Sequence, residues 1–312
     1  MKIDDKNINS LINRYINTVD NIANQYKYHI NIKHVLYIII PAFIIKYGLE
    51  NESKILKLFK DTEIIINENN IDNTETAFFY RNILKKHNNY IIDKKVVLNK
   101  FNQVPTIELI DSLIHEFNHA INSINNEVNI DNNHIYLRSG ILYTKYNKEN
   151  LTIIDSQQDY IILEEILNTI QTEEIINIIL SLNKYSANID NHEISNILYA
   201  LNKEIGNKYS SKAYFLQTYL SKELLRNRTF EKTLNSLRLS GNIINIEKWF
   251  DDITGKNNSY KILCQKLTNI HNLEIKYNKT KYFKQRILNN IKSNFTDISI
   301  IIEKFNDNCI YK

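Results

Sequence analysis

The sequence has few of the residues that make turns, with five glycines and two prolines among 312 residues. This scarcity excludes collagen-like and Pro/Gly-rich disordered chains, and it argues against a sandwich of many short strands. The chain has two cysteines, Cys264 and Cys309, which are too few to stabilise a protein of this length by disulfide bonds. This favours a reducing compartment. A hydrophobic content of 43% excludes an intrinsically disordered chain.

An excess of charge of one sign is also lacking. Lys and Arg number 39 against 35 Asp and Glu, a net charge of +4. The Lys-rich stretches near residues 202–235 and 275–292 are interpreted as ordinary solvated helix faces. A net charge this small does not by itself imply nucleic acid or an anionic membrane as a partner, and we expect no nucleic acid. A Gly-rich phosphate loop, a CxxC pair and a Gly-x-Ser-x-Gly motif are all absent from the sequence.

Long hydrophobic runs are missing as well. The strongest, residues 35–45, has about half the roughly 20 residues that a membrane span needs, and Pro41 interrupts it. The N-terminal segment MKIDDKNINSLINRY is acidic where a signal peptide is basic and then apolar. The sequence predicts a buried element at 35–45, no membrane span and a cytoplasmic protein, and it leaves non-classical export open.

The hydrophobic pattern predicts an α+β protein that is predominantly α-helical, with a small mixed sheet in its first half. We expect an N-terminal mixed lobe over residues 1–125 and a helical lobe over 126–312. Predicted helices cover residues 6–28, 53–60, 106–124 with Thr106 as N-cap, and 158–182, followed by amphipathic helices from 193 onward. Predicted strands cover 64–66 and 90–98, and residues 134–145 are predicted to form either a strand pair or one strand broken at Ser139-Gly140.

One motif carries chemistry: residues 115–119 read His-Glu-Phe-Asn-His. Two His four residues apart lie on one face of a helix, so His115 and His119 can bind one metal ion in a geometry that suits zinc. Glu116, next to the first His, can reach the water bound to the metal and accept its proton as a carbonyl is attacked. The pattern therefore predicts zinc-dependent hydrolysis with Glu116 as the general base.

This pentad, inside an apolar helix, resembles the active-site helix of the zincin metallopeptidases. The resemblance implies a zincin-like lobe with a small mixed sheet, a helical second lobe, a Zn²⁺ cofactor and a peptide or protein substrate. It extends over about residues 90–180 and indicates no narrower family. The metzincin continuation HExxHxxGxxH is excluded, because Asn occupies positions 122 and 125.

The resemblance is instead to the gluzincins, which supply a Glu from a downstream helix as the third ligand. Glu164 and Glu165 interrupt an apolar run there, and periodicity does not separate them because they flank the apolar face symmetrically. The gluzincin-like pattern aligns better with Glu165, which is the predicted third ligand. Asp131 and His134 are rival ligands.

An oxyanion donor is also expected in such a site. Tyr and Arg side chains that could serve are Tyr136, Arg138, Tyr143, Tyr214 and Tyr219. The alternative function is a non-catalytic helical protein-interaction module with a zincin-like fold or a chance motif. Substrate, cleavage specificity and oligomeric state are not predicted.

Overall fold

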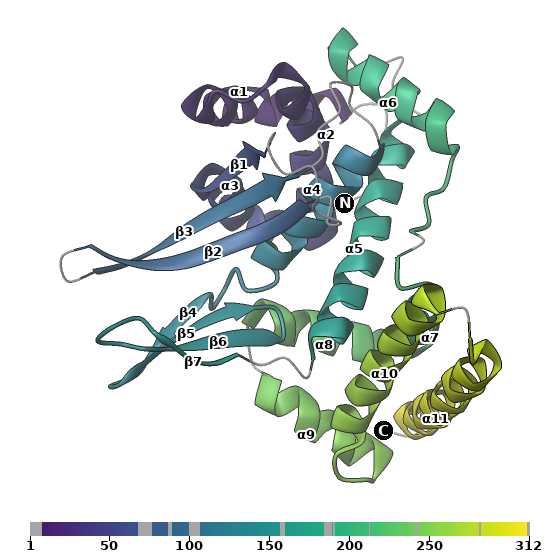
Figure 1. Cartoon of the computed structure of the whole chain (residues 1–312). Coiled ribbons are helices and arrows are strands. Elements are labelled where there is room, and N and C mark those ends of the chain that lie inside the picture. The colour runs from purple at the N-terminus through teal and green to yellow at the C-terminus, as the bar shows by residue number, and fades with distance from the viewer. Residues whose placement is uncertain are drawn as a thin grey trace. The chain divides into compact units, whose positions relative to one another are not determined.

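The computed structural model describes residues 8–67, 77–86, 89–99, 107–156, 160–183, 189, 191–211, 213–240, 243–280 and 282–310. Within these ranges the chain forms eleven α-helices and seven strands, and the strands make two small sheets (Figure 1). The predicted class, α+β with helix predominating, is confirmed.

The chain divides into two compact units, which we describe one at a time. The first combines residues 1–121 with 171–210, and the second combines 122–170 with 211–312. The predicted lobes have a similar first boundary, but residues 171–210 group with the first unit, so that each unit is discontinuous in sequence. Helix α5 (Ile161–Leu182) has residues in both units.

The first unit begins with three helices and contains the apolar run 35–45. This run lies in α2 (Ile30–Tyr47), where residues 35–44 are all buried, including Pro41. Among the described helices α2 is the one long and apolar enough to cross a membrane, yet 61% of it is buried inside the structure. A helix that is apolar all round is typical of a protein core. The neighbouring helices are α1 (Ile8–Tyr26) and α3 (Glu52–Asp61).

The sheet of the first unit has three strands in the order β1-β3-β2. Strand β1 (Thr62–Ile66) runs parallel to β3 (Asn89–Leu98), and β2 (Ala77–Lys86) runs antiparallel to β3. Because β1 pairs only with residues 94–98 of β3, the other half of β3 forms a two-stranded ribbon with β2 (Figure 1). Helix α4 (Ile107–Ile121) follows the sheet, and α6 (His192–Ile205) completes the unit.

The second unit combines an antiparallel meander with helices. Its sheet has the order β4-β5-β6-β7, and the helical core gathers the rings of Phe230, Phe250 and Phe305. The strands are β4 (Val128–Ile130), β5 (His134–Ser139), β6 (Leu142–Asn147) and β7 (Ile153–Ser156). The helices are α7 (Phe215–Leu225), α8 (Arg228–Ser240), α9 (Ile243–Thr254), α10 (Ser259–Lys279) and α11 (Lys284–Ile310).

Most predicted elements are confirmed, including the strand pair that turns at Ser139-Gly140. Strand β2 was not predicted, because its residues AFFYRNILKK do not alternate between apolar and polar. The run 35–45 was predicted to be buried but was assigned no helix, since a helix buried on all sides has no amphipathic period. The predicted N-cap Thr106 lies outside the described residues.

Candidate metal centre

Helix α4 positions the pentad by burying its apolar stripe. Leu113, Ile114 and Phe117 are fully buried, and the Phe117 ring stacks on Phe59 of α3 with 4.1 Å between ring centroids. Burial of this stripe in the first unit sets the rotation of the helix about its own axis.

The two imidazoles of the pentad lie beside each other on α4. His115 and His119 are half-buried, and their ring centroids are 5.1 Å apart with an interplanar angle of 73°. This arrangement is what i, i+4 spacing produces on a helix. Glu116, between them in sequence, is largely buried at 8% exposure.

A buried polar bridge holds α4 within the first unit. The Asn118 side chain accepts a hydrogen bond from the Tyr47 hydroxyl at 2.9 Å and donates one to Thr172 Oγ1 at 3.1 Å. Asn118 is fully buried, so loss of either partner would leave a buried polar group unsatisfied. The bridge therefore joins α4 to α2 and to the C-terminal part of α5.

A second carboxylate lies one turn before His115 on the same helix. Burial raises the pKa of Asp111, while His115 and a hydrogen bond with Tyr209 act in the opposite direction and Glu173 adds to the rise. Asp111 is thus within electrostatic reach of the first imidazole. Sequence reasoning missed Tyr209, because it lies more than 90 residues away from Asp111 in the chain.

Glu165 of α5 is the third member of a group of possible metal ligands. The side chains of His115, His119 and Glu165 each offer one ligand atom, and these atoms all lie within 4.8 Å of one another. All three residues are half-buried. A search of the described residues for three or more His, Cys, Asp or Glu side chains that could hold one metal ion finds this group alone.

Glu164, the alternative third ligand, is engaged elsewhere in the second unit. Its carboxylate is fully buried and pairs with the buried Arg238, at 2.5 Å from Nη2 to Oε1. Asn122 Nδ2 and the backbone N–H of Ile141 also donate to it, at 3.3 and 3.1 Å. The carboxylate is therefore neutralised and hydrogen-bonded without a metal.

The turn of the β5–β6 hairpin packs closely against this carboxylate. Gly140 has φ +58°, and a Cβ atom built there would lie 2.1 Å from Glu164 Oε1. Only glycine fits this position, because both its backbone conformation and its surroundings exclude a side chain. Arg238 also donates to Asn168 Oδ1 at 2.7 Å, so Asn168 belongs to the same network as Glu164.

The rival ligands Asp131 and His134 interact with each other near the start of β5. Their side chains are 3.3 Å apart, and Asp131 accepts hydrogen bonds from the backbone N–H groups of Asn133 and His134. Hydrogen bonding from Asn133, with His134 acting in the same direction, lowers the pKa of Asp131. The metal-ligand group found in the described residues includes neither of them.

Four of the five predicted oxyanion donors are tyrosines that contact another aromatic ring. Tyr136 packs edge to face on Tyr143 across β5 and β6, with 5.8 Å between ring centroids. Tyr214 contacts the ring of His271, and Tyr219 is 54% exposed and stacks on Phe295. Arg138 lies on β5 opposite Tyr143. The role of oxyanion donor stays a prediction for each of these side chains.

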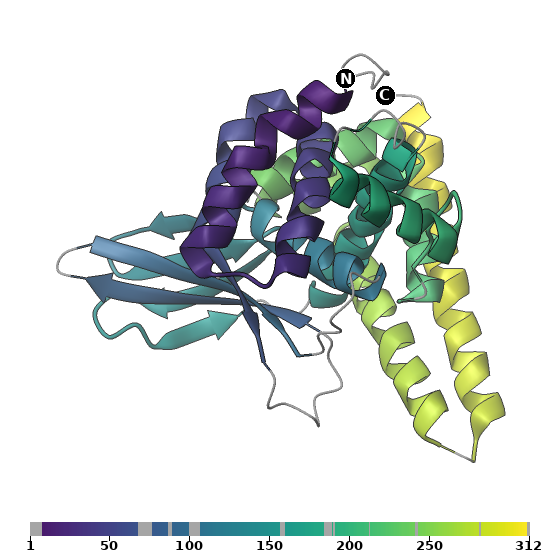
Figure 2. The same cartoon turned by 90° about the horizontal axis from the view of Figure 1, so that it is seen from above.

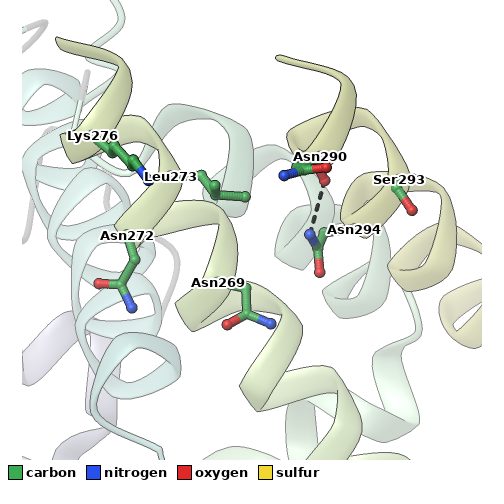
Figure 3. A pocket seen from close by; sticks show the side chains of 7 residues that line it. All are labelled: Asn269, Asn272, Leu273, Lys276, Asn290, Ser293 and Asn294. Carbon is green, nitrogen blue, oxygen red and sulfur yellow. Dashed lines mark hydrogen bonds between the residues drawn. The ribbon is translucent and has the colours of Figure 1, made fainter. Parts of the chain in front are cut away.

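A cavity of about 370 Å³ lies elsewhere, between α10 and α11 of the second unit (Figure 3). Asparagine amides dominate its lining, and Lys276 is its one charged side chain. Amides and a single ammonium group offer neither a carboxylate or imidazole base nor a set of metal ligands. Its lining residues are Asn269, Asn272, Leu273, Lys276, Asn290, Ser293 and Asn294.

Comparisons with known proteins add no assignment. No family model matches the chain, and no match was found among curated proteins or among solved structures.

Proposed function

We propose that this chain is a zinc-dependent metallopeptidase of gluzincin type. The observation that carries the proposal is the grouping of His115, His119 and Glu165, whose ligand atoms all lie within 4.8 Å of one another. Two His and one Glu are the protein ligands of a well-known class of catalytic zinc sites, which keep the fourth position for water or substrate. The sequence motif predicts His115 and His119, whereas the positions of the side chains add Glu165. These two lines of support are independent of each other.

The donor set fits zinc by its chemistry and by its size. Imidazole nitrogen and carboxylate oxygen bind zinc at about 2.0–2.2 Å. Ligand atoms in a tetrahedral site are about 3.3 Å from one another, so a group that spans up to 4.8 Å would contract by up to about 1.5 Å to close on the ion. When bound, zinc lowers the pKa of its water towards about 7 and polarises the carbonyl oxygen of the substrate.

The residues of the chain would share the remaining work. Glu116 accepts the proton of the attacking water and returns it to the leaving amine, the role of a general base that becomes a general acid. Asp111 orients the His115 imidazole from one turn away, as carboxylates commonly do for ligating His.

The substrate in this proposal is a peptide or protein, and the reaction takes place in the cytoplasm. Cys264 is buried and forms no disulfide with the described residues, which is compatible with a reducing compartment. This part of the proposal carries no residue-level assignment of specificity.

The test is hydrolysis of a mixed peptide library, compared between the wild type and E116Q. We expect the wild type to cleave peptides in a zinc-dependent manner, and we expect E116Q to bind zinc normally with turnover reduced by at least about 10²-fold. E108Q is a matched control, because Glu108 is exposed on the same helix and should not affect turnover. Equal cleavage by the wild type and E116Q would contradict the mechanism.

A further inference from the structure

The connection between α10 and α11 exposes two aromatic rings at the end of a helical hairpin. In Figure 2 the two helices run side by side to this connection. Tyr282 is 75% exposed and Phe283 is 79% exposed, the largest exposures among the large hydrophobic side chains described. Single exposed apolar residues are common on protein surfaces. Two adjacent exposed rings at the end of a hairpin instead form a small apolar surface that projects from the protein.

Cations flank these rings in the sequence, and acids are absent from the same stretch. Between Glu274 and Asp297 the sequence has six Lys and Arg and no Asp or Glu. Of these cations Lys276, Lys279, Lys284 and Arg286 are exposed in the structure. We call Lys279, Tyr282, Phe283, Lys284 and Arg286 the hairpin tip. The whole chain has a net charge of only +4, so the tip is a local concentration of charge that the overall composition does not reveal.

The backbone presents the rings by local hydrogen bonds. Thr280 Oγ1 donates to the carbonyl oxygen of Tyr282 at 3.1 Å and accepts from the Tyr282 N–H at 3.3 Å. Phe283 has φ +61°, a left-handed conformation that is unfavourable for an aromatic residue. Below the tip, Ile270 and Ile287 are buried in the core of the second unit, and Lys266 pairs with Asp297 at 2.7 Å between α10 and α11. The rings are therefore held outward on a packed hairpin.

We propose that the hairpin tip docks onto the surface of a membrane that contains anionic lipids. Aromatic side chains are favourable at the boundary between headgroups and acyl chains, and Lys and Arg beside them attract anionic headgroups. An acidic protein surface would complement the cations alone. A bilayer complements both the cations and the two exposed rings, which is why we favour it. This docking is peripheral and does not depend on the proposed peptidase activity.

The experiment is co-sedimentation of the full chain with vesicles. Vesicles of phosphatidylcholine with about 30 mol% phosphatidylserine should bind the protein, and vesicles of pure phosphatidylcholine should bind it at least about tenfold less. Raising the salt from about 0.1 M to about 0.5 M should weaken the binding, because the shorter Debye length screens the cations.

Two variants separate the contributions of ring and charge. Y282S/F283S and K279E/K284E should each lower the partition onto the anionic vesicles by about tenfold or more. Matched controls are Y199S, which removes a ring that is 66% exposed on α6, and K232E/K261E, which reverses two exposed lysines elsewhere. The controls should bind almost as the wild type does, apart from a small effect of net charge. Far-UV circular dichroism of each variant checks that the fold is retained.

Three results would overturn the proposal. One is that the wild type does not sediment with anionic vesicles, in which case the tip serves another acidic surface or none. Another is equal sedimentation with neutral and anionic vesicles. The third is a loss of binding in K232E/K261E as large as that in K279E/K284E, which would mean that overall charge and not the hairpin tip is responsible.

Discussion

Two neighbouring glutamates on α5 have opposite surroundings. Glu164 is fully buried and accepts hydrogen bonds from Arg238, Asn122 and the backbone of Ile141. Glu165 is half-buried and is grouped with two imidazoles, side chains that bind metals when neutral. The first carboxylate is neutralised by a cation of the chain, whereas the second lies in a set of ligands that a metal ion would complete.

Under the proposed function, one helix carries a structural carboxylate next to a metal-binding one. Adjacent residues on a helix point about 100° apart, so the burial of Glu164 on one side determines where Glu165 points. We infer that the Glu164 network sets the rotation of α5 and thereby helps to present Glu165. The following predictions test this difference, beginning with the largest expected effect.

R238M should have the largest effect on the stability of the fold. It leaves the Glu164 carboxylate buried without its cation, a loss of about 3–5 kcal/mol in the free energy of unfolding. Urea denaturation of R238M and of the double variant E164L/R238M measures the effect. The double variant should recover most of the loss, because it removes both charges. If R238M is as stable as the wild type, the buried pair does not hold this region together.

E165A should abolish tight zinc binding while leaving the metal-free fold nearly intact. We expect zinc affinity to fall by about 100-fold or more, since a site with three protein ligands seldom tolerates the loss of one. The unfolding free energy of the metal-free protein should change by less than about 1 kcal/mol, because Glu165 is half-buried.

Competition titration with a zinc chelator gives the affinity of E165A, and H134A provides the matched control. His134 is the rival ligand, and its loss should leave the zinc affinity unchanged. If H134A lost zinc and E165A retained it, the third ligand would be His134 and not Glu165.

G140A should destabilise the protein by about 2–3 kcal/mol. The left-handed backbone alone costs a residue with a side chain about 1–2 kcal/mol, and the added Cβ would also collide with Glu164. Gly255 is a matched control within the same unit, since its φ is +62° and a Cβ there would meet nothing within 4 Å. The free energies of unfolding obtained from thermal melts of G140A and G255A should therefore differ by the free-energy cost of the collision with Glu164. Equal melts would show that the hairpin turn adapts to Glu164.

D111N should weaken zinc binding by about tenfold, the smallest of these effects. The variant keeps the shape of Asp111 but removes the charge that acts on His115. The chelator titration measures it, with E108Q as the control on the exposed side of α4. An unchanged affinity in D111N would mean that Asp111 has no part in orienting the imidazole.

The sequence predicted the local part of the candidate site and the fold class. His115 and His119 are four residues apart on one helix, so their proximity follows from helix geometry alone. The role of Glu164 could not be predicted, because its partner Arg238 is 74 residues away in sequence. Nothing in the periodicity of α5 distinguishes Glu164 from Glu165, since the difference arises from the residues that pack on each side of the helix. Strand β2 escaped prediction for a similar reason, because pairing with β3, and not an alternating pattern, makes it a strand.

The central claim, that α4 and α5 form a zinc site, is tested most directly by elemental analysis of the purified full chain. The measurement is zinc per chain in the wild type, in H119A and in E164Q/R238M, with folding checked by circular dichroism. The account predicts about one zinc per wild-type chain and none in H119A. It predicts that E164Q/R238M keeps its zinc if it folds, since neither residue is a ligand. A wild type without zinc after saturation and desalting, or an H119A variant with one zinc per chain, would contradict the account.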